Sequence, residues 1–266
     1  MNRICPKATR AVGASVLSAL LMLGGCASPG GSTGGGSSGI VASEATASNV
    51  ARVGFLTDYA RLRPAPAGGG MLCWRSADVD WKRYDKILFE RIQVYIAPGS
   101  QKPVDPTDLK MLIDYFHGAL VKAIQTEAQV VNAAGPGVLR VQIALTSLVP
   151  TNTVDSLAGT AIPYGFVAEI GSGAATGRPT GSTPYMGQTG LEVKFRDGVS
   201  GKVVAECADT EIGRKYAADL NAGATGAAEA WVNGYLESFT QWSYAKDAFD
   251  KWARVFAQRF AALRGA

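Results

Sequence analysis

Four stretches of this chain have the residue pattern of β-strands. Residues 86–96, KILFERIQVYI, are rich in β-branched and aromatic side chains. Residues 139–145 and 191–196 alternate apolar with polar positions, and the turn sequence DGVSG joins the latter to a fourth strand at 202–207. The alternation predicts a sheet with one face against a core and the other face in water.

A period of about 3.6 residues marks two helices. Asp105 and Pro106 are residue types that begin a helix, and the apolar stripe that follows is Leu109, Leu112, Ile113, Phe116, Leu120 and Ile124. A second helix is predicted at 243–263, ending before Gly265, with a stripe of Phe249, Trp252, Phe256, Phe260 and Leu263.

The order of these elements is strand, helix, strand, hairpin and helix. It predicts an α+β fold, a mostly antiparallel sheet of about four strands with helices packed on one face. This domain would occupy 50–266, after a leader at 1–25 and a linker at 26–49. We also expect Asp247 and Lys251, which are four residues apart, to form a pair on the outward side of the last helix.

The first residues resemble a bacterial lipoprotein signal. Arg3, Lys7 and Arg10 precede a short apolar run at 11–23, and two glycines then lead directly into Cys26. The resemblance implies cleavage before Cys26, a diacylglyceryl thioether on its sulfur, and acylation of the new amino terminus with a chain such as palmitate. The thiol is the nucleophile that takes the lipid.

Lipidation would hold the protein at a membrane. Two or three acyl chains anchor a protein durably, and the Gly/Ser-rich residues 27–49 would act as a flexible tether. Ala27 stands where an aspartate would signal retention in the inner membrane. We therefore expect a lipoprotein of the outer membrane whose folded body faces the periplasm.

Charge and composition reduce the number of function classes that fit this chain. The chain has 26 basic and 22 acidic side chains, a net charge of +4, and loss of the three basic residues of the leader would leave 23 basic against 22 acidic side chains. A nearly neutral body gives no support for nucleic-acid binding, which needs a clustered basic surface, and we expect no nucleic-acid partner. His117 is the only histidine, which removes any two-histidine zinc site. The sequence predicts no cofactor and no metal.

Two cysteines of the body, Cys73 and Cys207, leave two interpretations open. The periplasm is oxidising, so they would form a disulfide that closes a long loop. Alternatively, Cys207 is a small apolar residue on the strand face of Val203 and Ala205, and Cys73 lies in a separate place. Sequence spacing does not establish that the two are close.

The segment 151–186 is rich in Gly, Thr, Ala and Pro. Long segments without periodicity are uncommon inside compact domains and tend to be functional or disordered. Its exposed apolar side chains would form a contact loop for a partner. These residues are Ile162, Tyr164, Phe166, Ile170, Tyr185 and Met186. In the alternative interpretation, the segment folds back on the sheet as a lid or an extra hairpin.

Four pieces of the chain resemble one bacterial family. They are GFLTDYARL at 54–62, DVDWKRYDKILFERIQVY at 78–95, LEVKFRDGVSGKVVAECADTEIG at 191–213 and FDKWARVFAQRF at 249–260. In this order the pieces resemble the lipoproteins grouped as domain-of-unknown-function family 3313. The resemblance implies an envelope lipoprotein, and because the family has no established activity it supplies no catalytic residues.

Two functions follow from these observations. The first is a noncatalytic binding or assembly module of the cell envelope, attached to the membrane by its lipid and contacting an envelope protein or peptidoglycan. The second is an envelope glycan hydrolase with a carboxylate pair, such as Asp78 or Asp80 with Glu211. A cleft that brings those acids together would favour the hydrolase.

Cys26 provides a direct test of the lipoprotein interpretation. Cys26→Ala should abolish lipidation and leave unprocessed precursor, because no other thiol stands at the leader boundary. Metabolic labelling with a clickable fatty acid measures this. Equal label in the wild type and the variant would exclude the lipoprotein signal.

Overall fold

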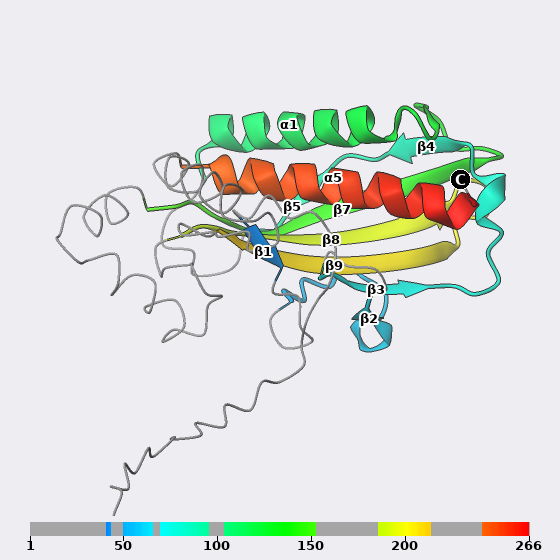
Figure 1. Ribbon diagram of the computed structural model, residues 1–266, viewed down its shortest axis with the longest axis horizontal. Coiled ribbons are helices and arrows are strands. Elements are labelled where there is room, and N and C mark those ends of the chain that lie inside the picture. The colour runs from blue at the N-terminus through cyan, green and yellow to red at the C-terminus, as the bar shows by residue number, and fades with distance from the viewer. Residues whose placement is uncertain are drawn as a thin grey trace, which may run out of the picture. The chain divides into compact units, whose positions relative to one another are not determined.

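Nine strands form one mixed sheet in the part of the chain that the structure describes, which is residues 41–43, 50–65, 70–95, 104–152, 186–213 and 241–265. In this computed structural model the strand order is β2-β3-β9-β8-β7-β4-β6, with β1 also beside β9 and β5 also beside β7 (Figure 1). The strands are β1 (Val41–Ser43), β2 (Arg63–Pro64), β3 (Leu72–Arg75), β4 (Lys86–Phe89), β5 (Gln93–Val94), β6 (Gln129–Val130), β7 (Val138–Val149), β8 (Gln188–Asp197) and β9 (Val203–Gly213), and the helices are α1 (Pro106–Ile124) and α5 (Ser243–Arg264).

The centre of the sheet is an antiparallel meander of β7, β8 and β9. Its side chains alternate between two environments, as the sequence predicts. Val141, Val193 and Ala205 are buried beneath the helices, whereas Ala144 and Ala208 pack on the opposite face.

The prediction of a mostly antiparallel sheet of about four strands is wrong, although the α+β class is right. β4 and β5 run parallel to β7, and β6 runs parallel to β4. The chain passes through α1 between β5 and β6, and a helical crossover of this kind joins parallel strands. The strands that the sequence did not predict, β1, β2, β3 and β6, have two to four residues each, which is too short for a period of two to identify them. β1 lies within 26–49 and pairs with β9, so the prediction of a flexible linker is wrong at 41–43.

The two helices lie side by side on one face of the sheet (Figure 1). Asp105 caps α1 by accepting a hydrogen bond from the Thr107 amide at 2.8 Å. Phe116 of α1 stacks on Phe249 of α5, with ring centroids 4.5 Å apart. α5 ends at Gly265, whose φ of 79° lies in the left-handed region that glycine adopts without strain. The apolar stripes predicted from the sequence therefore form the interface between these helices and the sheet.

One charged side chain of α5 points inward. Lys251 is only 6% exposed and donates to Glu211 of β9 at 2.5 Å, so the predicted outward pair of Asp247 and Lys251 is wrong. The adjacent Trp252 donates its indole N–H to Asp209 at 2.8 Å. Burial and the neighbouring Asp209 raise the pKa of the Glu211 carboxyl, against the lowering effect of Lys251. These polar contacts fix the middle of α5 on β9.

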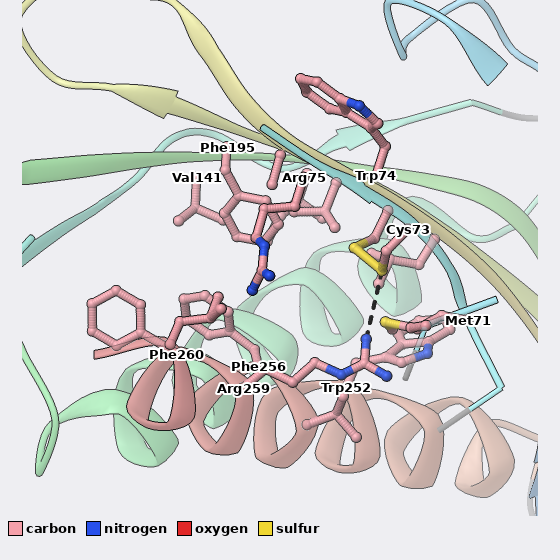
Figure 2. A pocket seen from close by; sticks show the side chains of 18 of the residues that line it. Met71, Cys73, Trp74, Arg75, Val141, Phe195, Trp252, Phe256, Arg259 and Phe260 are labelled. Atoms are coloured by element: carbon pink, nitrogen blue, oxygen red, sulfur yellow. Dashed lines mark hydrogen bonds between the residues drawn. A yellow bond between two sulfur atoms is a disulfide. The ribbon is translucent and has the colours of Figure 1, made fainter. Parts of the chain in front are cut away.

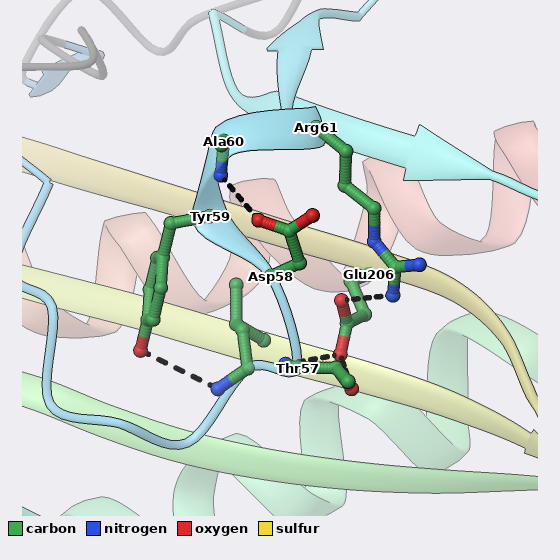
Figure 3. Close-up of polar contacts among 7 residues, drawn as sticks. Thr57, Asp58, Tyr59, Ala60, Arg61 and Glu206 are labelled. Atoms are coloured by element: carbon green, nitrogen blue, oxygen red, sulfur yellow. Dashed lines mark hydrogen bonds and ion pairs between the residues drawn. The ribbon is translucent and has the colours of Figure 1, made fainter.

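An N-terminal arm, residues 50–62, packs on the opposite face of the sheet (Figure 3). Glu206 of β9 is fully buried and accepts hydrogen bonds from the amide and hydroxyl of Thr57, at 2.7 and 2.6 Å, and from the Arg61 guanidinium at 2.6 Å. Burial raises the pKa of Glu206, but the hydrogen bonds from Thr57 and Arg61 outweigh it, and the pKa lies below its ordinary value. The face that the sequence assigns to water is thus partly covered.

Asp197, at the end of β8, organises the turn into β9. It accepts hydrogen bonds from the Ser200 amide at 2.7 Å and from the Tyr84 hydroxyl at 3.0 Å. The Ser200 amide and hydroxyl, together with Tyr84, lower the pKa of Asp197 from 3.8 to about 2, although burial acts in the other direction.

Asp197→Asn should therefore lower the free energy of unfolding by about 1–2 kcal/mol at neutral pH. A carboxyl whose pKa is depressed by folding stabilises the protein above its unfolded pKa, and this contribution is lost as the pH falls through the folded pKa. The difference between wild type and variant should shrink between pH 3.8 and pH about 2. Urea unfolding at several pH values measures it, with the exposed Asp78→Asn as control. A difference that stays constant with pH would contradict this role.

Candidate functional site

A cavity of about 530 Å³ lies between the sheet and the helices (Figure 2). Strands β3, β7, β8 and β9 line one side, α1 and α5 line the other, and residues 63–65 of the β2 region contribute to the edge. Among the described residues that line it, all are apolar except Arg63, Arg75 and Arg259. Its size is typical of small-molecule sites, which occupy about 300–1,000 Å³.

Several apolar side chains in the cavity wall are only half-buried, although they lie on the inward faces of their elements. Phe195 of β8 and Phe256 of α5 stack with ring centroids 5.7 Å apart, and both remain partly accessible. Val255 and Leu263 of α5 are also half-buried. Covering such apolar surface with an apolar molecule removes it from water and lowers the free energy.

A disulfide fixes the sheet side of the cavity. Cys73 of β3 and Cys207 of β9 are directly opposite each other, with Cα atoms 4.1 Å apart, and their sulfur atoms are bonded. The structure therefore has the first of the two arrangements that the sequence leaves open. Both cysteines line the cavity, and the Arg259 guanidinium donates to the Cys73 sulfur at 3.5 Å.

Two arginines reach into the cavity from opposite sides, as Figure 2 shows. Arg75 extends from the end of β3 and is exposed, and Arg259 extends from α5 and is half-buried. Burial lowers the pKa of the Arg259 guanidinium, against the raising effect of Asp209. Arg63 of β2 lies at the edge. The cavity thus combines apolar walls with positive charge.

The carboxylates proposed for a hydrolase do not come together. Asp78 and Asp80 are exposed, and Asp80 caps a short turn by accepting from the Lys82 amide at 3.1 Å. Just before them, the Ser76 amide pairs with Val204 of β9 at 2.9 Å. Glu211 is seven residues beyond Val204 on β9, so at the usual rise per residue its backbone lies roughly 23 Å from the place where Asp78 and Asp80 leave the sheet. Catalytic carboxylate pairs lie within about 10 Å.

Most of the other predicted site residues lie outside the described part of the chain. These are Cys26 and, in the contact loop, Ile162, Tyr164, Phe166, Ile170 and Tyr185. Met186, at the end of that loop, is described and is only 3% exposed. Its side chain is therefore part of the packed interior.

The remaining candidates do not form a reactive site. His117 is exposed on α1 and contacts the Phe89 ring edge-on at 6.0 Å between centroids. Within the described ranges no group of three or more His, Cys, Asp or Glu side chains could hold a metal ion. No helix in the described ranges is long and apolar enough to cross a membrane.

Sequence reasoning missed the cavity and its arginines. One signal was present in α5, where Arg259 follows Trp252 and Phe256 at spacings of seven and three residues and so falls beside the apolar stripe. A charged residue at such a position is unusual unless it meets a partner. No signal identified Arg75, because the short strand β3 has no periodic pattern.

Comparisons with known proteins give one family and weak structural likenesses. The profile described as "Protein of unknown function (DUF3313)" matches residues 52–236. No curated protein matches the sequence. Among solved structures, the PelC dodecamer from Paraburkholderia phytofirmans is 11% identical, with a TM-score of 0.29, over 64% of this chain and 98% of that one.

A DUF4136 family protein from Bacteroides thetaiotaomicron is 12% identical, with a TM-score of 0.26, over 64% of this chain and 96% of that one. A DUF330 protein from Xanthomonas campestris is also 12% identical, with a TM-score of 0.26, over 62% of this chain and 86% of that one. Likenesses this weak carry no argument about fold or function.

The disulfide should be quantitative in exported protein and should stabilise the fold. Unfolded wild-type protein should show no free thiol from Cys73 or Cys207 without reductant, and the Cys73→Ala/Cys207→Ala variant should lose about 2–4 kcal/mol of unfolding free energy because the bond restricts the unfolded chain. Thiol titration and urea unfolding measure these. Two titratable thiols, or an unchanged midpoint, would contradict the expectation.

Proposed function

The chain belongs to the DUF3313 family, proteins of unknown function, and from its own site we propose that it is a noncatalytic binding module of the cell envelope that takes an apolar small molecule into the cavity between the sheet and α5. The observation that carries this proposal is the cavity itself. Its walls are apolar, several of their side chains remain accessible, and its volume suits a small molecule.

The chemistry of the lining favours binding over catalysis. Among the described residues that line the cavity, none is a carboxylate, a histidine or a hydroxyl side chain, and both cysteines are held in a disulfide. Acid–base and nucleophilic catalysis need such groups within reach of the substrate. The arginines that are present supply charge and hydrogen bonds, which suit recognition.

The predicted leader and linker support an envelope location for this module. An acylated Cys26 would hold the module at the outer membrane, and a tether between Cys26 and β1 would place the folded body in the periplasm close to the lipid surface. A membrane is a source of apolar ligands. The contact loop predicted at 151–186 would serve an envelope protein or peptidoglycan partner.

A neutral apolar fluorophore tests binding. Phenylnaphthylamine should increase in fluorescence and saturate with the chain expressed as residues 26–266 carrying Cys26→Ala, which lacks both the lipid and the apolar leader. In that background Val255→Trp should weaken binding about tenfold or more, because the indole would fill the cavity next to Phe256.

Arg254→Trp is the matched control, since it adds the same indole to an exposed position of α5 outside the lining. It should bind the fluorophore as the parent does. Melting temperatures of the variants should stay close to that of the parent. Absence of saturable binding in the parent, or equal binding by folded Val255→Trp, would refute the proposed function.

A further inference from the structure

We infer that the ligand of this cavity is a free single-chain aliphatic carboxylate, whose chain lies against the aromatic wall and whose head group lies between Arg75 and Arg259. The inference rests on the proposed function, because it specifies the ligand class of the same cavity. It depends on three features: the sign of the charge at the lining, the direction of the two arginines, and the apolar surface beside them.

The charge at the cavity has one sign. Three arginines and no acidic side chain line it within the described residues. Arginine stems can cover apolar surface while their head groups remain in water, and that accounts for an exposed residue such as Arg63. Arg259 is half-buried beside the apolar cavity, where a guanidinium loses hydration, and the charge of Asp209 offsets part of that loss. A bound anion would add a negative charge on the cavity side, within reach of Arg75 as well.

The two guanidinium groups are presented from opposite sides to the same space. Arg75 comes from β3, and Arg259 comes from α5, where its contact with Cys73 holds it towards the strand (Figure 2). Arg75 makes no ion pair within the described part of the chain. A guanidinium offers a planar fork of N–H donors that matches the two oxygens of a carboxylate. This arrangement suits a carboxylate head group.

The surface beside the arginines suits an alkyl chain. The stacked rings of Phe195 and Phe256 and the side chain of Val255 border the cavity and are partly accessible. Each methylene that enters such a site should strengthen binding about fourfold. The cavity volume is in the lower half of the range for small-molecule sites, so we assign one chain rather than the two of a phospholipid.

Three ligands with the same chain and different head groups test the charge. Dodecanoate, dodecanol and dodecyltrimethylammonium are titrated below their solubility or micelle limits into residues 26–266 carrying Cys26→Ala, and binding is followed by calorimetry. We expect dodecanoate to bind about tenfold more tightly than dodecanol, and the cation to bind most weakly. Octanoate should bind at least tenfold more weakly than dodecanoate.

Arginine variants locate the head group. Arg75→Gln should weaken dodecanoate binding about tenfold and leave dodecanol binding unchanged, because only the anion uses the guanidinium. Arg254→Gln, at an exposed position outside the cavity, is the charge-matched control and should change neither ligand. Arg259→Gln should act as Arg75→Gln does. If Arg259→Gln loses its melting transition, the test rests on Arg75→Gln, which changes an exposed side chain.

The outcomes separate this inference from the proposed function. If phenylnaphthylamine binds but dodecanoate and dodecanol bind equally, or Arg75→Gln weakens both equally, the cavity binds apolar molecules and the carboxylate assignment is wrong. If neither the fluorophore nor any alkyl ligand binds, both proposals fail. Binding to phosphatidylglycerol vesicles without binding of dodecanoate would indicate that the anion belongs to a lipid surface. It would overturn the assignment of a free carboxylate as the ligand.

Discussion

The pairing of the short strand β3 with β9 is the constraint on which the cavity depends. Cys73 lies opposite Cys207 and is bonded to it, so the register of β3 cannot slip, and Cys73 faces the helices while Trp74 faces the other side. α5 packs on β8 and β9. The covalently held strand β3 therefore extends the sheet beyond β9 into a wall of the cavity.

Buried charges fix different elements on the two faces of the sheet. On the helix face, Lys251 of α5 pairs with Glu211. On the other face, Glu206 accepts hydrogen bonds from Thr57 and Arg61 of the N-terminal arm (Figure 3). Both carboxylates lie on β9. Moving either element would separate the partners and leave a buried charge uncompensated. These contacts therefore specify one position for each element.

The function proposed for the site follows from this division. Polar groups near β9 are mostly engaged in holding α5 and the arm, which leaves the space beneath β3 to apolar side chains and to arginines from β3 and α5. Walls of this kind have few groups that can react and much surface that can bind. The lipid attachment expected at Cys26 would place that surface near a membrane, where aliphatic molecules are abundant.

The sequence by itself determined the α+β class, the two long helices with the Asp105 cap of α1 and the Gly265 end of α5, and the alternation of β7, β8 and β9, because these depend on periods and end signals that local residues carry. Only the tertiary structure decided the rest. The parallel pairing of β4 with β7, the inward turn of Lys251, and the position of Arg75 and Arg259 at one cavity all depend on residues far apart in the chain. No local pattern records such contacts, because their free energy arises only when distant elements pack together.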